Sequence, residues 1–177
     1  MEKQREYTTR DFKFEYPLNW VINEAGLRHG AYIATFADAY IPISTGSTSV
    51  LPEISSKQGT AVISVQPWDR NPAYSLDRWA DFEGEVNISG ETVEVIILER
   101  GIISEIESEN LFIKYEVPAV GLEGKAVYVA SEQERGEDGP TIVYEFRLLY
   151  NESDQMENKK IYEAVLSQIL STFRFVE

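Results

Sequence analysis

The stretch Thr141-Ile-Val-Tyr-Glu-Phe-Arg-Leu-Leu-Tyr150 decides the fold of this 177-residue chain. Every second position from Ile142 to Tyr150 is aliphatic or aromatic, a period typical of a strand with one face in a core. The run Lys125–Ala130 precedes it, across a polar connection that contains glycine and proline. Two such runs on either side of a turn predict an antiparallel hairpin.

An amphipathic helix is predicted directly after this hairpin. Asp154 and Glu157 have the spacing of a capping box, in which side chains satisfy backbone donors at the start of a helix. The apolar residues that follow recur at i, i+3, i+4, i+7 and i+8, and so share one helix face. They are Tyr162, Val165, Leu166, Ile169 and Leu170. Phe173 and Phe175 then alternate into a short closing strand.

The rest of the chain is also dominated by strand patterns. Strands are predicted at 12–16, 20–22, 31–36, 60–66, 92–98 and 111–117, and one further helix at Leu76–Val86. Strands and helices do not alternate in the way that builds a parallel sheet. We therefore expect one α+β domain over residues 1–177, with helices packed on the faces of a central antiparallel sheet. Residues 1–10 are expected to form a flexible lead.

Residues 37–59 interrupt this pattern as a long loop rich in serine, threonine, glycine and proline. Loops of this length are uncommon and often serve as binding loops or lids. This one also carries more apolar surface than a linker requires. It is either a loop packed over the edge of the sheet or a lid over a ligand. The candidate binding residues are Tyr40, Ile41, Ile43, Val50 and Leu51.

The chain has 30 acidic and 16 basic residues, a net charge of −14. Nucleic acids and anionic membranes attract basic surfaces, so neither is an expected partner. No apolar run is long enough to span a bilayer. Residues 1–10 are polar and hold no signal peptide, so the chain either starts in the cytoplasm or follows a removed export leader.

Most catalytic classes lack the residues that they need. The chain has no cysteine, and His29 is its only histidine. A Ser-His-Asp triad would have to use His29, which lies in a predicted turn, and no nucleophile-elbow motif accompanies it. No spacing selects a pair of catalytic carboxylates from the 30 acids. We expect a protein that is not an enzyme, and a hydrolase is the third choice.

The connection between the two hairpin strands is the best candidate for a cation site. It carries four carboxylates, with Arg135 as the one opposing charge: Glu132, Glu134, Glu137 and Asp138. Oxygen ligands at this density suit calcium, although exposed loops bind it only at about millimolar levels. The same residues are also explained as solvated turn charges. We expect no tightly bound cofactor, and at most weak calcium binding.

Three segments together resemble a known family. They are Phe12–Val21 (FKFEYPLNWV), then Ala61–Val65 followed by Ser75–Trp79, and finally the C-terminal strand, helix and Ser171–Phe175. Their order and spacing are similar to those of the PsbP-like domains, named for an extrinsic protein of the photosystem II oxygen-evolving complex. The resemblance implies a central antiparallel sheet of about six or seven strands with helices on both faces. It also implies a non-catalytic role with a protein partner.

Members of this family often work outside the cytoplasmic membrane, attached through a lipid-anchored cysteine. The resemblance therefore implies a non-enzymatic, extracytoplasmic binding or accessory module of bacterial type, anchored by a removed leader, and cytoplasmic if there is no such leader. The alternative is a small-molecule or cation binder that uses a pocket under the 37–59 loop. A broad exposed aromatic patch would favour the first function, and a bound ligand or a deep polar pocket would favour the second.

Overall fold

The computed structural model describes residues 3–24, 30–41, 53–70, 75–77, 85–88, 91–131 and 141–176. Strands dominate this part of the chain, and α2 (Met156–Thr172) is the one α-helix in it with described bounds. A short 3-10 turn, η2, spans Pro118–Val120. The strands form a sheet of seven strands, a sheet of three strands and two small two-stranded sheets.

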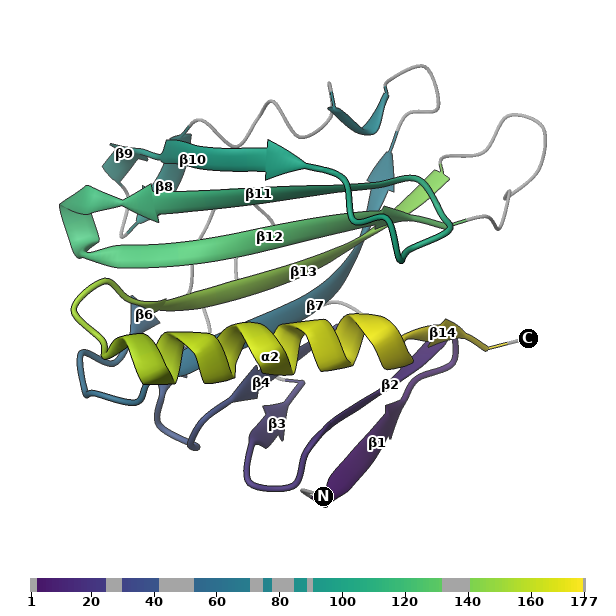
Figure 1. Ribbon diagram of the computed structural model, residues 1–177, viewed down its shortest axis with the longest axis horizontal. Helices are drawn as coiled ribbons and strands as arrows, with labels where there is room; N and C mark the ends of the chain where they lie inside the picture. The colour runs from purple at the N-terminus through teal and green to yellow at the C-terminus, as the bar shows by residue number, and fades with distance from the viewer. Residues whose placement is uncertain are drawn as a thin grey trace.

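The main sheet has the strand order β10-β11-β12-β13-β7-β4-β3, and all neighbouring strands are antiparallel. Their bounds are β10 Ile96–Gly101, β11 Asn110–Val117, β12 Leu122–Ala130, β13 Thr141–Asn151, β7 Ala61–Arg70, β4 Ala31–Ala34 and β3 Val21–Asn23. Figure 1 shows β10 at one edge of this sheet and α2 lying across one of its faces. The seven-stranded antiparallel sheet implied by the resemblance is present.

The predicted hairpin forms the middle of this sheet. Phe146 of β13 lies opposite Val127 of β12 on one side and Val65 of β7 on the other. All three side chains are fully buried. The even-numbered residues of β13 face the main core, so the period of two correctly predicted both the strand and its buried face.

The three-stranded sheet has the order β1-β2-β14, with β1 at Gln4–Thr8, β2 at Phe12–Pro17 and β14 at Arg174–Phe175. β1 lies in the segment predicted to be a flexible lead, and Tyr7 is opposite Phe14 in its pairing with β2. Four of the five β1 residues are exposed, so the segment looks polar in the sequence. The segment is nevertheless an ordered strand, because its backbone pairs with β2 and Tyr7 packs on the core.

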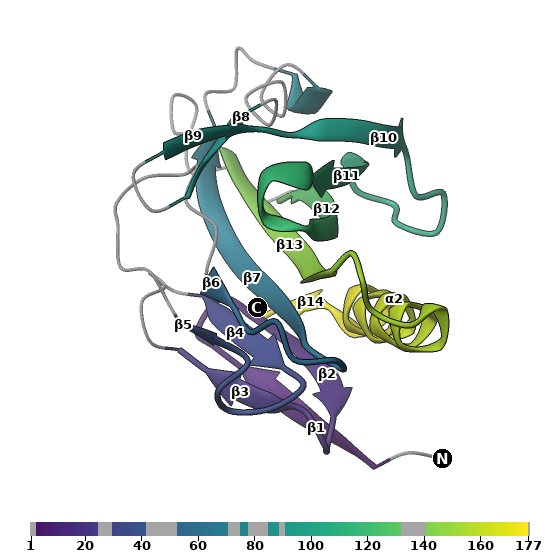
Figure 2. The same ribbon diagram turned by 90° about the vertical axis from the view of Figure 1, so that its left-hand side faces the viewer.

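The main core lies between the large sheet, α2 and the three-stranded sheet. The helix buries Tyr162, Val165, Leu166 and Ile169, as its periodicity predicted. Trp20 is buried in the same core, against the ring of Tyr162. Figure 2 shows α2 and β14 on the same side of the main sheet. Because β2 pairs with β14, strands from the N-terminal and C-terminal segments lie together in the three-stranded sheet.

The predicted α+β class, with helices packed on both faces, is wrong: the protein is mostly β. On the face opposite α2, the core is closed by strand residues and by the 75–77 segment, including Val95 and Leu76. Of the predicted helix Leu76–Val86, residues 76 and 77 are helical, residues 78–84 lie outside the described residues, and residues 85 and 86 are extended. β8 (Glu85–Ile88) pairs with β9 (Glu91–Glu94), and Val86 lies opposite Val93. Such β-branched pairs favour a hairpin over a helix.

Candidate functional site

The ends of the predicted 37–59 binding loop are held by a two-stranded sheet. β5 (Tyr40–Ile41) pairs with β6 (Glu53–Ile54), with Tyr40 opposite Ile54. Of the five predicted binding residues, only Tyr40 has a described side chain. Ile41 is described in its backbone alone, and Ile43, Val50 and Leu51 lie outside the described residues. The predicted calcium ligands Glu132, Glu134, Glu137 and Asp138 also lie outside them.

Tyr40 is buried in a small apolar cluster on the face of the sheet opposite α2. Its ring lies 4.6 Å from the ring of Tyr32, centroid to centroid. Burial raises the pKa of the Tyr40 hydroxyl, and the neighbouring Tyr32 raises it further. The Tyr40 hydroxyl has no hydrogen-bond partner in the described part of the chain. This unpartnered hydroxyl bears directly on the predicted loop site.

A buried ion pair lies on β13, on the side of the sheet away from α2. Arg147 Nε donates to one carboxylate oxygen of Glu145 at 3.0 Å, and Nη2 donates to the other at 3.1 Å. The two residues are two positions apart on one strand, so their side chains share a face. Arg147 Nη1 also donates to the Tyr115 hydroxyl, and Nη2 to the Tyr128 hydroxyl, both at 3.3 Å.

This arrangement is a closed structural network. All three guanidinium nitrogens donate to groups of the protein itself, so the charge of Arg147 is compensated inside the sheet. A buried charge is tolerated only with such compensation. The charge of Glu145 also acts on Tyr32. Burial is the larger cause that raises the pKa of the Tyr32 hydroxyl, and the charge of Glu145 raises it further. Nothing in it presents a free nucleophile or base.

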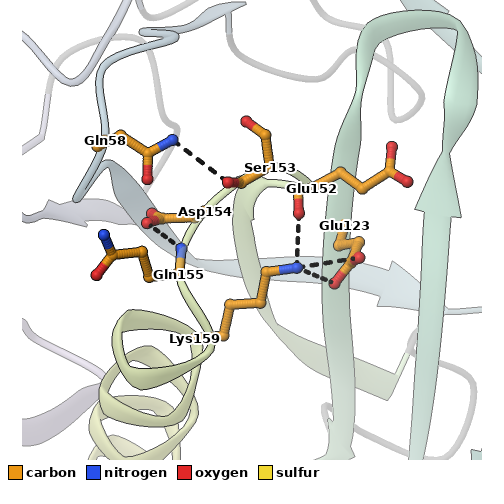
Figure 3. A network of polar contacts seen from close by, with 7 residues as sticks. All are labelled: Gln58, Glu123, Glu152, Ser153, Asp154, Gln155 and Lys159. Carbon is orange, nitrogen blue, oxygen red and sulfur yellow. Dashed lines mark hydrogen bonds and ion pairs between the residues drawn. The ribbon is translucent and has the colours of Figure 1, made fainter.

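A second polar network joins the start of α2 to the sheet (Figure 3). Lys159 Nζ donates to both carboxylate oxygens of Glu123 on β12 at 3.3 Å, and to the carbonyl of Glu152 at 2.7 Å. Gln58 Nε2 donates to the carbonyl of Ser153 at 3.3 Å. The helix start is thereby tied both to β12 and to the turn that precedes β7.

Asp154 is the centre of this junction. Its carboxylate accepts hydrogen bonds from the backbone N–H of Gly59 and Gln155, from the amide of Asn158 and from the hydroxyl of Tyr162. Burial alone would raise the pKa of Asp154, but the four donors outweigh it and hold the pKa below its usual value. The predicted capping box is replaced by this arrangement, in which Gln155 is the N-cap and its side chain makes no cap hydrogen bond.

The most unusual surface in the described residues is the edge strand β10. Three consecutive aliphatic side chains are exposed there, and a fourth follows the strand: Ile96 at 38%, Ile97 at 41%, Leu98 at 58% and Ile102 at 74%. We call these four residues the β10 edge patch. Single exposed aliphatic residues are common, but four exposed ones between positions 96 and 102 of a sheet edge indicate an interaction surface.

The pairing of β10 with β11 explains the exposure of Leu98. Ile97 lies opposite Tyr115 and Glu99 lies opposite Lys114, so the register shifts by one residue at Leu98. This bulge leaves Leu98 without an opposite residue, and bulges of this kind redirect a side chain. No strand pairs with β10 on its other side in the described sheet order.

The sequence contained a signal for this patch that periodicity did not capture. The stretch 92–98 was predicted as one half-buried strand, but it breaks at the buried Val95 into β9 and β10. Ile96, Ile97 and Leu98 are consecutive and do not alternate with polar residues. Such a run is expected in a strand buried on both faces. Only the strand order reveals that it lies at an edge.

Within the described ranges, which do not include His29, the acidic side chains form no group of three or more that could hold a metal ion. None of the helices described is both long and apolar enough to cross a membrane. No protein-family model matches the chain, and no curated protein matches its sequence. The resemblance to the PsbP-like domains therefore stays a prediction based on the residues quoted above.

Proposed function

We propose that this protein is a non-enzymatic binding module that docks a protein partner on the β10 edge patch. The observation that carries the proposal is the exposure of three consecutive aliphatic side chains, Ile96, Ile97 and Leu98, on a strand that has one pairing partner among the described residues. A sheet edge presents a row of backbone donors and acceptors that another chain can use. Burial of aliphatic side chains adds about 25 cal/mol per Å² of apolar surface removed from water.

The proposal is tested by selecting ligands from a random peptide library on the folded protein. The same selection is run on two variants, Ile97→Lys and Ile161→Lys. Ile161 is a matched control because it is an isoleucine, 54% exposed, on the outer side of α2. Circular dichroism and thermal melting confirm that both variants fold.

We expect the native protein and Ile161→Lys to enrich the same peptides, and Ile97→Lys to lose them. A lysine at position 97 would place a hydrated charge where a partner must exclude water. Peptides that bind all three proteins equally well would contradict the proposal. A selection that enriches no peptide on the native protein would contradict it too.

A second candidate function, small-molecule binding beside β5, is favoured by the Tyr40 hydroxyl. This hydroxyl is buried and has no partner in the described residues, and a ligand under the 37–59 loop would supply one. A thermal-shift screen of small molecules on the native protein and on Tyr40→Phe tests this function. Compounds that stabilise the native protein by several degrees and lose that effect in Tyr40→Phe would support it. A screen without such compounds would reject it.

A further inference from the structure

We infer that the partner presents an extended segment in which aliphatic residues alternate with lysine or arginine, and that this segment adds to the main sheet as a strand next to β10. The inference rests on the proposed function and specifies the chemistry of the partner. It follows from three properties of β10: its open backbone edge, the way its own charges are used, and the charge of the surrounding chain.

The backbone of β10 can pair with an added strand. In an antiparallel sheet, alternate residues of an edge strand direct N–H and C=O groups away from the sheet. β10 is six residues long, which is enough for several hydrogen bonds to an added strand. An extended peptide can satisfy these groups while its alternate side chains contact the aliphatic residues of β10. A helical partner would leave them unpaired.

The charged residues of β10 do not protect its edge. Natural edge strands often carry charges that repel an incoming strand or cannot be desolvated. In β10, Glu99 is paired with Lys114 of β11, at 3.4 Å. Arg100 is paired with Asp77, at 2.8 Å. Because both charges are paired within the chain, neither stands as an uncompensated charge against an added strand.

The negative charge of the residues around β10 favours a positively charged partner. Residues 91–109, which contain β9, β10 and the turn that follows, hold six glutamates and one arginine. Glu94 precedes the patch and Glu105 follows it, and both are exposed. A segment that carries lysine or arginine would meet complementary charge on both sides of the patch, which raises the rate of association and opposes acidic competitors.

A second copy of this chain is a poor occupant of the same edge. Each copy has a net charge of −14, and pairing two β10 strands would bring two copies of the glutamate-rich 91–109 segment together. Like charges placed side by side across an interface are destabilising. The aliphatic residues alone would permit self-association. The negative charge of the chain instead favours a basic partner.

The inference is tested with a nine-residue peptide of alternating lysine and valine, blocked at both ends. One control peptide has glutamate in place of every lysine. Another has the same side chains but is N-methylated at every internal residue, so it has no backbone donors for a sheet. Binding is measured by calorimetry at low and moderate salt, and hydrogen exchange locates the contact.

We expect the lysine peptide to bind at least about tenfold more tightly than either control peptide, and more weakly as salt rises. Hydrogen exchange should slow at Ile96–Arg100 and remain unchanged in α2. Leu98→Lys should weaken binding about tenfold or more, whereas Ile161→Lys, with a similarly exposed apolar residue replaced, should leave it unchanged.

Several results would overturn the inference. Absence of binding, equal binding of the glutamate peptide, or equal binding of the N-methylated peptide would each do so. A dimer that dissociates on Leu98→Lys would show that a second copy is the occupant. If the library yields peptides that depend on Ile97 but are acidic, neutral or helical, this inference fails and the proposed function stands. If no peptide depends on Ile97, both fail.

Discussion

The hydroxyl of Tyr162 donates a hydrogen bond of 2.7 Å to the carboxylate of Asp154, eight residues earlier in the chain. This contact joins the buried face of α2 to the turn where β13 ends. The same carboxylate accepts the backbone N–H of Gly59 from the turn before β7, a segment 95 residues away. One aspartate thus fixes the position of α2 relative to two strands of the main sheet.

Asp154→Asn should destabilise the protein near neutral pH by about 1–3 kcal/mol. The reason is that the amide NH2 group of asparagine donates hydrogen bonds, whereas both native carboxylate oxygens accept them. The pKa of Asp154 is lower in the folded state than its usual value of 3.8. Its stabilising contribution is therefore complete above that value and is lost as the pH falls through the lower folded pKa.

Urea unfolding of both proteins at about pH 7 and about pH 2 checks this pH dependence. The difference in unfolding free energy between native protein and Asp154→Asn should be largest at the higher pH and should shrink at the lower one. An equal difference at both values would show that Asp154 acts by shape alone and that its charge contributes nothing.

Arg147→Met should be strongly destabilising, by about 3–5 kcal/mol, because it leaves the Glu145 carboxylate buried without its partner. The double variant Arg147→Met, Glu145→Leu should recover much of this loss, since no charge then remains buried. Lys114→Met is the surface control: its pair with Glu99 is partly exposed and should cost less than about 1 kcal/mol.

The free energies of unfolding of the native protein, Arg147→Met, Glu145→Leu and the double variant form a double-mutant cycle. A double variant that is less stable than Arg147→Met would mean that the aliphatic replacements do not fit the sheet. A loss below about 1 kcal/mol for Arg147→Met itself would contradict the buried ion pair as described.

Leu166→Ala and Ile169→Ala should each cost about 2–5 kcal/mol, because both side chains are buried between α2 and the main sheet. Ile161→Ala is a matched control on the outer side of the same helix, and it should shift stability by less than about 1 kcal/mol. Thermal and urea unfolding of the three variants give the comparison. Similar losses at positions 161 and 169 would contradict the orientation of α2.

These elements show how far the sequence could predict the fold. Periodicity is a local property, so the alternation in β13 and the apolar face of α2 were predicted correctly. β1 was missed because its residues are mostly exposed and its order depends on a partner strand. The α+β class was wrong because strands dominate the described residues. The expected second helix, Leu76–Val86, was judged by apolar spacing, and its last residue, Val86, instead lies in a strand opposite Val93.

The candidate site was also harder to predict because its position depends on which strands pair with each other. Ile96, Ile97 and Leu98 form a short aliphatic run, which the sequence cannot distinguish from a strand inside a sheet. Its position at an edge depends on the order of seven strands, and that order is set by contacts between distant segments. The Arg147–Glu145 pair was similarly invisible, because alternation marks β13 residues 145 and 147 as solvent-facing.

Tyr40→Phe should leave the stability unchanged or raise it by up to about 1 kcal/mol. The Tyr40 hydroxyl is buried and has no hydrogen-bond partner in the described residues, so its removal takes away an uncompensated desolvation cost. Tyr162→Phe is the same chemical change at a hydroxyl that donates to Asp154, and it should lower the stability by about 1–3 kcal/mol. Urea unfolding of both variants shows whether each substitution raises or lowers the free energy of unfolding. If Tyr40→Phe is as destabilising as Tyr162→Phe, the Tyr40 hydroxyl has a partner within the protein, and small-molecule binding beside β5 loses the observation that favours it.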